Sequence, residues 1–240
     1  MKSEFMIKMS RSLRGPMKPR VLTTVALYEV VAKHFPNIKI SSFYERIGDL
    51  VAIGDIKRVY KGLYINTQAI PKVTAGEVAK EIAPGSVVSL HSALSQAGVI
   101  NNPSRVVTLV IPVNPRGWKQ GDRSEIVTDI GDYWLFRMPE RFVHCSGLAD
   151  SDVFVQTTNY PLATAEKAFA DWLYMGTGRS SRFSTLPPLD IELEKMSIQR
   201  MRRIVKFMGI EHALDDWLTV KKEYDNSENV RMNMSADMGY

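Results

Sequence analysis

The spacing of apolar and polar residues between positions 41 and 66 changes partway along, from that of a helix to that of a hairpin. In residues 42–53, apolar side chains recur every three or four positions and so share one face of a helix. Ser41 or Ser42 can cap the first turn of this helix, and Gly54 can end it. The apolar stripe consists of Phe43, Ile47, Leu50 and Val51.

Residues 56–60 and 63–65 are two short runs rich in β-branched and aromatic residues, and Lys61-Gly62 supplies a turn between them. A helix that leads into a basic two-stranded ribbon is typical of the second half of a winged helix-turn-helix. In that module the helix enters the major groove of DNA and the ribbon lies along the backbone. A small helix-hairpin unit can also be part of an ordinary core, so a purely structural role stays open. The ribbon carries three cations where phosphate would lie, namely Lys57, Arg58 and Lys61.

The helix face opposite the apolar stripe is acidic, because Glu45 and Asp49 project from it. Carboxylates repel phosphate, and they read bases only by accepting a hydrogen bond from cytosine. We therefore expect base reading from the flanks of this helix. The candidate DNA-binding residues are Ser42, Tyr44 and Arg46 on the helix, Lys57, Arg58 and Lys61 on the ribbon, and Arg11 and Arg14 in the basic segment before them.

The flanking sequence predicts where this first module begins and ends. Residues 3–13 have helical spacing of their apolar side chains, and Gly15-Pro16 breaks the helix that they predict. Residues 22–34 predict a second helix, and residues 68–73 look like a linker. The sequence thus predicts a winged helix DNA-binding domain at residues 1–70 and a second domain at residues 71–240.

The second module mixes helices and strands, which predicts a mixed α/β domain and an α+β fold class for the whole chain. Residues 115–122 read as a polar loop that holds Trp118. The expected elements are a helix at 74–82, a strand at 87–88, a helix at 89–97, a buried strand at 105–113, a hairpin at 124–130 and 133–138, and a strand at 153–158.

The C-terminal third is predicted to be helical. Thr164 caps a helix that runs to Met175, Ser197 begins another, and residues 211–224 form the last. Residues 225–240 are polar without periodicity, so we expect a frayed tail there. The helix after Ser197 carries a second basic face, for which a solvated helix face is the alternative interpretation. This face consists of Arg200, Arg202, Arg203 and Lys206.

The distribution of charged residues divides the chain close to the predicted domain boundary. Residues 1–72 hold 13 basic and 5 acidic side chains, a net charge of +8, whereas residues 73–240 hold 18 and 21, a net charge of −3. A basic N-terminal module favours a polyanionic partner, nucleic acid first. The single cysteine excludes an internal disulfide framework and fits a reducing cytoplasm, where we expect the protein. No apolar run approaches the length of a membrane span, so no membrane association is expected.

Catalytic signals are sparse. His144 and Cys145 are adjacent, but neighbours on a strand point to opposite faces, so we expect no base–nucleophile pair. The loop at 176–181 could hold an anion on backbone amides, but it lacks the Lys-Ser/Thr pair that ends a phosphate loop, so a flexible connector is the preferred interpretation. The carboxylate-x-lysine pattern of many metal-dependent nucleases occurs once, at Asp55 to Lys57, inside the ribbon rather than in the second module. The sequence therefore predicts no catalytic residue, no metal site and no cofactor.

Three stretches in this order carry a family resemblance. GDIKRVYKGLY at 54–64 resembles Gly-x-Ile/Leu-x-Arg-Val-x-x-Gly-x-Tyr, and GSVVSLHSALSQAGV at 85–99 resembles a strand that enters a Ser-Ala-Leu helix. TAEKAFAD at 164–171 resembles a Thr-Pro-Glu-Lys-Ala-Leu-x-Asp helix start, with Ala165 in place of proline. The chain thereby resembles the AbiEi family of antitoxins, which are transcriptional regulators of type IV toxin–antitoxin systems.

The resemblance implies a repressor that binds operator repeats in double-stranded DNA and controls its own operon. It also implies a C-terminal antitoxin domain at 71–240 that counters a nucleotidyltransferase-like toxin without a stable complex, and no enzymatic activity. Two alternatives remain open. One is a stand-alone winged-helix regulator whose second domain senses a ligand or partner, and the other is a DNA-processing enzyme.

Overall fold

The computed structural model describes residues 2–14, 19–102, 104–113, 122–178, 181, 183 and 185–237, and it has a mixed α+β fold. The loop predicted at 115–122 lies outside the described residues except for Asp122, as do residues 179 and 180 of the predicted 176–181 loop. The chain forms two compact units. The first comprises the residues up to Gly85 together with Ile126–Tyr133, and the second comprises Ser86–Glu125 and the residues from Trp134 onward.

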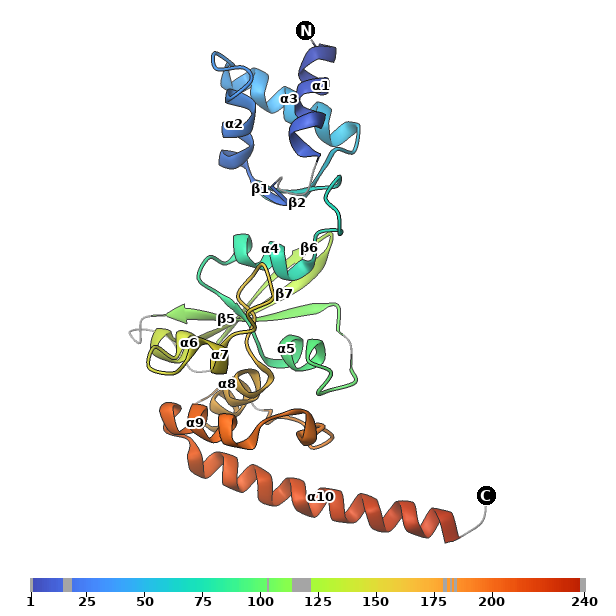
Figure 1. Cartoon of the computed structure of the whole chain (residues 1–240), viewed down its shortest axis with the longest axis vertical. Helices are drawn as coiled ribbons and strands as arrows, with labels where there is room; N and C mark the ends of the chain where they lie inside the picture. Colours follow the sequence, from blue (N-terminus) through green and yellow to red (C-terminus); the bar gives the residue numbers. More distant parts are fainter. Residues whose placement is uncertain are drawn as a thin grey trace. The chain divides into compact units, whose positions relative to one another are not determined.

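The first unit combines helices with a small antiparallel sheet (Figure 1). The strand order of this sheet is β1-β3-β2. Its core lies where α1, α2 and α3 meet, and Met9, Leu27, Phe43 and Leu50 are almost completely buried in it. In chain order the elements are α1 (Lys2–Leu13), β1 (Val21–Thr23), α2 (Thr24–Ala32), α3 (Ile40–Ala52), β2 (Ile56–Tyr60), β3 (Leu63–Asn66) and α4 (Ala75–Ile82).

Three local predictions for this unit were wrong. The helix predicted to begin at residue 22 begins at Thr24, because Leu22 and its neighbours pair with β3 as a strand. The N-cap of α3 is Lys39, without a side-chain cap, so Ser41 and Ser42 lie inside its first turn. Val51 is 38% exposed rather than part of the apolar stripe. In each case tertiary packing outweighs the local sequence signal.

The start of α4 is tied back to the segment before β1. Thr74 and Glu77 form a reciprocal capping box at this helix start. The Glu77 carboxylate also accepts from Arg20, with Nε to Oε1 at 2.5 Å. Burial by itself would raise the pKa of Glu77, but Arg20 and Thr74 outweigh that effect and hold this pKa below its usual value. The helix that the sequence assigned to the second domain therefore belongs to the first compact unit.

The second unit is built on a four-stranded sheet of order β4-β5-β7-β6, whose hairpin tip at Ile126–Tyr133 clusters with the first unit. Helices α5 and α8 pack together, and α9 and α10 form a further layer against α8 (Figure 1). The elements are β4 (Val87–Val88), α5 (Leu90–Gln96), β5 (Val106–Val113), β6 (Arg123–Thr128), β7 (Gly131–Pro139), α6 (Glu140–His144), α7 (Asp150–Val153), α8 (Ala165–Thr177), the 3-10 turn η1 (Leu193–Lys195), α9 (Ile198–Met208) and α10 (Glu211–Asp237).

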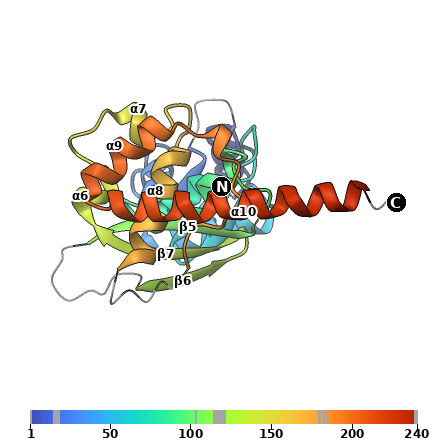
Figure 2. The ribbon, with the colours of Figure 1, turned by 90° about the horizontal axis from the view of Figure 1, so that it is seen from below.

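Two predictions for the second unit were also wrong. The strand expected at 153–158 is replaced by the end of α7 and a single bridge from Phe154 to Ala163. The final helix does not stop near Tyr224, because α10 continues to Asp237 and extends past α8 and α9 (Figure 2). The segment holds no glycine or proline before Gly239, and a Lys221–Asp225 ion pair at i,i+4 supports the helix.

The start of α8 is hydrogen-bonded to α7 and to the start of α9. As predicted, Thr164 caps this helix by accepting from the Lys167 amide, and its own hydroxyl donates to the Asp152 carbonyl at 2.7 Å. Glu166 accepts from the Ser197 amide at 2.8 Å and from Arg200 at 3.3 Å, so it joins α8 to the start of α9. This motif is therefore a structural element of the second unit.

Candidate nucleic-acid interface

The outer face of α3 carries two small residues, Ser41 and Gly48, beside two larger ones, Tyr44 and Glu45. Ser41, Tyr44, Glu45 and Gly48 are exposed, and Tyr44 has 56% of its surface accessible. A Cβ built on Gly48 would meet no atom within 4 Å, so the space above the helix is open. The backbone of α3 is therefore accessible at Gly48, between the exposed side chains of Tyr44 and Glu45 and the end of the helix.

Arg46 does not project from that face. Its guanidinium lies 5.7 Å from the centroid of the Phe5 ring in α1, and its Nη1 lies 3.3 Å from Asp49 Oδ2. Only 16% of the Arg46 side chain is accessible. This geometry favours Arg46 as a link between α3 and α1, and it neutralises the Asp49 carboxylate. The sequence placed two acids, Glu45 and Asp49, on the helix face opposite the apolar stripe. Of these two, Glu45 has no cationic partner among the described residues.

Ser42 also lies on the side of α3 that is near α1 and the α2–α3 connection. It lines a pocket of about 610 Å³ between α1, the α2–α3 connection and α3, together with Phe35, Lys39 and Arg46. Of the three helix residues predicted to contact DNA, Tyr44 alone lies on the open face.

The β2–β3 hairpin, called the ribbon below, displays its cations on one edge strand. Lys57 and Arg58 are both exposed, and a bulge between Arg58 and Tyr60 interrupts the pairing of β2 directly after them. Lys57 lies 3.4 Å from Asp129, but both side chains are largely accessible, so this ion pair is weak and exchangeable.

The tip of the ribbon is fixed against the start of α2. Lys61 is exposed at the turn, and Gly62 adopts a φ of +71°. The Gly62 carbonyl accepts from the Thr24 amide at 2.9 Å, and a Cβ at Gly62 would lie 3.3 Å from the Thr24 hydroxyl. The turn therefore requires glycine, and the position of Lys61 is set by packing rather than by a mobile loop.

The arginines before the ribbon lie at the C-terminal end of α1. Arg11 and Arg14 are exposed there. The end of this helix is anchored by a hydrogen bond from Ser10 to the buried Asp55, and by a 2.7 Å contact between Ser12 and His34. Asp55 is consequently tied into the core of the first unit instead of presenting a carboxylate to a partner.

The second basic face on α9 is mostly neutralised. Arg203 forms a bidentate pair with Asp152, from Nε to Oδ2 at 3.1 Å and from Nη2 to Oδ1 at 2.9 Å, and Arg202 lies 3.0 Å from Asp215. Arg200 bridges Asp152 and Glu166, and Lys206 is exposed. This arrangement favours a structural role for the three arginines, which differs both from a second anion-binding face and from the solvated helix face that the sequence offered as the alternative.

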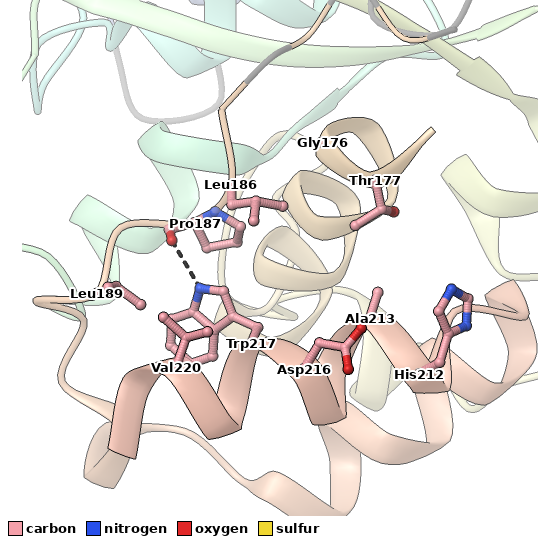
Figure 3. Close-up of a pocket in the computed structure, with 10 residues that line it drawn as sticks. All are labelled: Gly176, Thr177, Leu186, Pro187, Leu189, His212, Ala213, Asp216, Trp217 and Val220. Carbon is pink, nitrogen blue, oxygen red and sulfur yellow. Dashed lines mark hydrogen bonds between the residues drawn. The ribbon is translucent and has the colours of Figure 1, made fainter. Parts of the chain in front are cut away.

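A pocket of about 480 Å³ lies between the end of α8, the segment after it and α10 (Figure 3). The Trp217 indole donates from Nε1 to the Pro187 carbonyl at 2.9 Å, so its polar atom is satisfied. Leu186 and Val220 flank the opening, each with 48% of its surface accessible. The Trp217 contact fastens α10 to the preceding segment.

The remaining candidates do not assemble into a reactive centre. Cys145 is buried at the end of α6, where Sγ lies 3.2 Å from the Phe142 carbonyl. His144 is the last residue of that helix, so the prediction that both residues lie on a strand was wrong. Among the described residues, no three His, Cys, Asp or Glu side chains gather as metal ligands. Within the same residues, no helix has the length and apolar character needed to cross a membrane.

No family model and no curated protein matches this chain. Among solved structures, the chain is similar to the crystal structure of the RV2827C protein from Mycobacterium tuberculosis, with a TM-score of 0.54 and 12% sequence identity. The similarity covers 90% of this chain and 81% of the mycobacterial one. At this identity it shows a shared fold.

Proposed function

We propose that α1 to β3 form a winged helix that binds double-stranded DNA, and that the protein is a transcriptional repressor of the antitoxin type. The observation that carries this proposal is the combination of element order and surface. Along the chain, the unit consists of a helix, a strand, two helices and a hairpin. The strands form a sheet of order β1-β3-β2. The same unit presents an open helix face and an exposed basic ribbon, which is the arrangement that places a helix in the major groove.

The distribution of paired and unpaired charge supports the proposal. Several carboxylates of the first unit are occupied by internal partners: Asp49 by Arg46, Asp55 by Ser10 and Glu77 by Arg20. The exposed cations of the ribbon have weaker internal contacts, so they are the positive charges of this unit that are most available to an anionic partner.

The proposed contacts follow from the chemistry of each surface. Lys57, Arg58 and Lys61 bind phosphate and so give affinity that does not depend on sequence. The small residues Ser41 and Gly48 leave room for the groove beside α3, where Tyr44 packs on base edges. Glu45 opposes phosphate, and it becomes favourable where it accepts from the amino group of a cytosine.

The repressor and antitoxin parts of the proposal rest on the resemblance of residues 54–64, 85–99 and 164–171 to AbiEi antitoxins. In this proposal the first unit occupies operator repeats, and the second unit counters a nucleotidyltransferase-like toxin in the cytoplasm without forming a stable complex. The test in cells is co-expression with the product of a neighbouring nucleotidyltransferase-like gene. Restored growth supports an antitoxin, and growth arrest that persists at full antitoxin expression overturns that part while leaving DNA binding open.

DNA binding is tested by fluorescence anisotropy of the full chain on its own upstream DNA and on random duplex across a salt series. Replacing Lys61 with alanine should weaken binding on both duplexes about equally and reduce the salt slope by about one unit. Arg202→Ala is the matched control, because it removes a cation from α9 and should leave the slope unchanged. A slope that responds to Arg202→Ala but not to Lys61→Ala would place the DNA on the second unit instead.

A further inference from the structure

The tip of the β6–β7 hairpin, residues Ile126–Tyr133, brings a carboxylate against the ribbon. Both the hairpin tip and the ribbon belong to the first unit. The charged residues of the tip are two acids, Asp129 and Asp132, and the tip holds no basic residue. Asp129 Oδ2 lies 3.4 Å from Lys57 Nζ. An acid from a distant part of the sequence is therefore paired with one of the cations proposed to bind phosphate.

An ordered turn sets the position of Asp129. The Thr128 hydroxyl, itself buried, donates to the Gly131 carbonyl at 2.7 Å and so closes the turn around Asp129. The Tyr133 ring at the end of the tip is completely buried, and its hydroxyl donates to the Ala75 carbonyl of α4 at 3.0 Å. Because α4 is part of the same unit, this hydrogen bond anchors the tip within it.

Lys57 differs from the other two cations of the ribbon in having an acidic partner. In the part of the chain that the structure describes, Arg58 donates to the Tyr60 carbonyl at 3.4 Å and Lys61 forms no ion pair. DNA can therefore contact Arg58 and Lys61 without displacing a carboxylate. Contact between phosphate and Lys57 instead requires the phosphate to replace or share the place of Asp129.

The Lys57–Asp129 pair is exposed enough to exchange. The side chains of Lys57 and Asp129 are 47% and 65% accessible, so water and salt screen the attraction between them. An exposed pair of this kind contributes modestly to stability, and a phosphate can displace the carboxylate from the ammonium. The carboxylate then remains beside the phosphate and repels it. The pair is thus suited to reducing affinity by a modest factor while still permitting binding.

We infer that the Asp129 carboxylate competes with DNA phosphate for Lys57 and thereby lowers the DNA affinity of the first unit. The inference rests on the proposed DNA-binding function, to which it adds an internal competitor at the same surface. Lys57 is proposed to contact phosphate, and phosphate contacts carry no direct sequence information, so the reduction applies equally to all duplexes. It is largest at low salt, where charges on exposed groups are least screened.

The test is fluorescence anisotropy of the full chain on its own upstream DNA and on random duplex. Asp129→Asn removes the charge and keeps the size of the side chain. It should tighten binding to both duplexes by about two- to fivefold at low salt, which is the range for one exposed ion pair, and this gain should shrink as salt rises. Asp132→Asn makes the same charge change in the hairpin tip, where Asp132 has no cationic partner among the described residues. Its gain should be smaller.

A double-mutant cycle identifies the cation involved. In a Lys57→Gln background, Asp129→Asn should give no more gain than Asp132→Asn, because the group for which it competes is absent. In a Lys61→Gln background, the full gain from Asp129→Asn should persist. All four positions lie on exposed or half-buried parts of the unit, and thermal unfolding checks that each variant is folded.

Two kinds of failure are distinguishable. If the unmodified chain binds DNA but Asp129→Asn gives no gain, or a gain that survives in the Lys57→Gln background, the competition inference is overturned and the proposed function stands. A gain equal to that of Asp132→Asn also overturns it, since general repulsion then accounts for the effect. If the unmodified chain binds neither duplex at low salt, the proposed function fails and the inference fails with it.

Discussion

The Ser89 hydroxyl donates a 2.6 Å hydrogen bond to the Asp171 carboxylate across 82 positions of sequence, and both residues are fully buried. Lys167, one turn earlier on α8 and equally buried, donates to the other carboxylate oxygen. This cluster joins the strand-to-helix stretch at 85–99 to the helix start at 164–171. Two of the stretches that carry the family resemblance are therefore joined by one buried cluster of polar side chains.

The first prediction concerns this buried cluster. Asp171→Asn leaves the Lys167 ammonium buried without its counterion, so unfolding in urea should show a loss of about 3–5 kcal/mol. The Lys167→Met, Asp171→Leu double variant should lose less than Asp171→Asn, because it removes both charges together. Equal losses in both variants would mean that the ion pair is not what holds these segments together.

The second prediction separates the two acids of α3. Glu45 lies on the exposed face without a cationic partner among the described residues, whereas Asp49 is paired with Arg46. Glu45→Gln should therefore raise affinity for random duplex DNA by roughly two- to fivefold at low salt, because one repulsive charge is removed. Asp49→Asn should raise it less. The measurement is anisotropy on random duplex, and a larger effect of Asp49→Asn would mean that α3 presents a different face to DNA.

The third prediction is a pH dependence in the first unit. The pKa of Glu77 is lowered in the folded protein, so its contribution to stability is present above its ordinary pKa of 4.5 and is lost as the pH falls below that value. Glu77→Gln should therefore destabilise the protein at neutral pH, and its deficit relative to the unmodified chain should shrink in acid. Thermal unfolding across this range measures the effect. Glu81→Gln, an exposed position on the same helix, is the control and should show no such convergence.

The fourth prediction concerns the single cysteine. Burial raises the pKa of Cys145 to about 11, and 1% of its surface is accessible. The thiolate is the reactive form, so alkylation by iodoacetamide should be slow in the native protein at neutral pH and should accelerate in urea. Because the chain has one cysteine, the labelled fraction reports this site alone. Rapid native labelling would show that the end of α6 opens readily.

The sequence by itself located most of the helices and strands of both units. The apolar stripe of α3, the turn at Gly62 and the cap at Thr164 depend on residues a few positions apart, so they are visible in the sequence. The three-residue strand β1 is not visible in this way, because it is defined by pairing with β3, whose partner residues lie 40 to 44 positions later.

Tertiary structure decided which charged and aromatic side chains are available to a partner. The arginines of α9 looked like a basic surface, but Asp152 and Glu166 reach them from elements distant in sequence. The Arg46 guanidinium likewise packs over the ring of Phe5, which belongs to α1 and is distant from it in sequence. Lys167 and Asp171 look like solvated helix residues until Ser89 and the surrounding core enclose them. Side-chain availability depends on neighbours brought together by folding, whereas helix and turn formation depends mainly on neighbours along the chain.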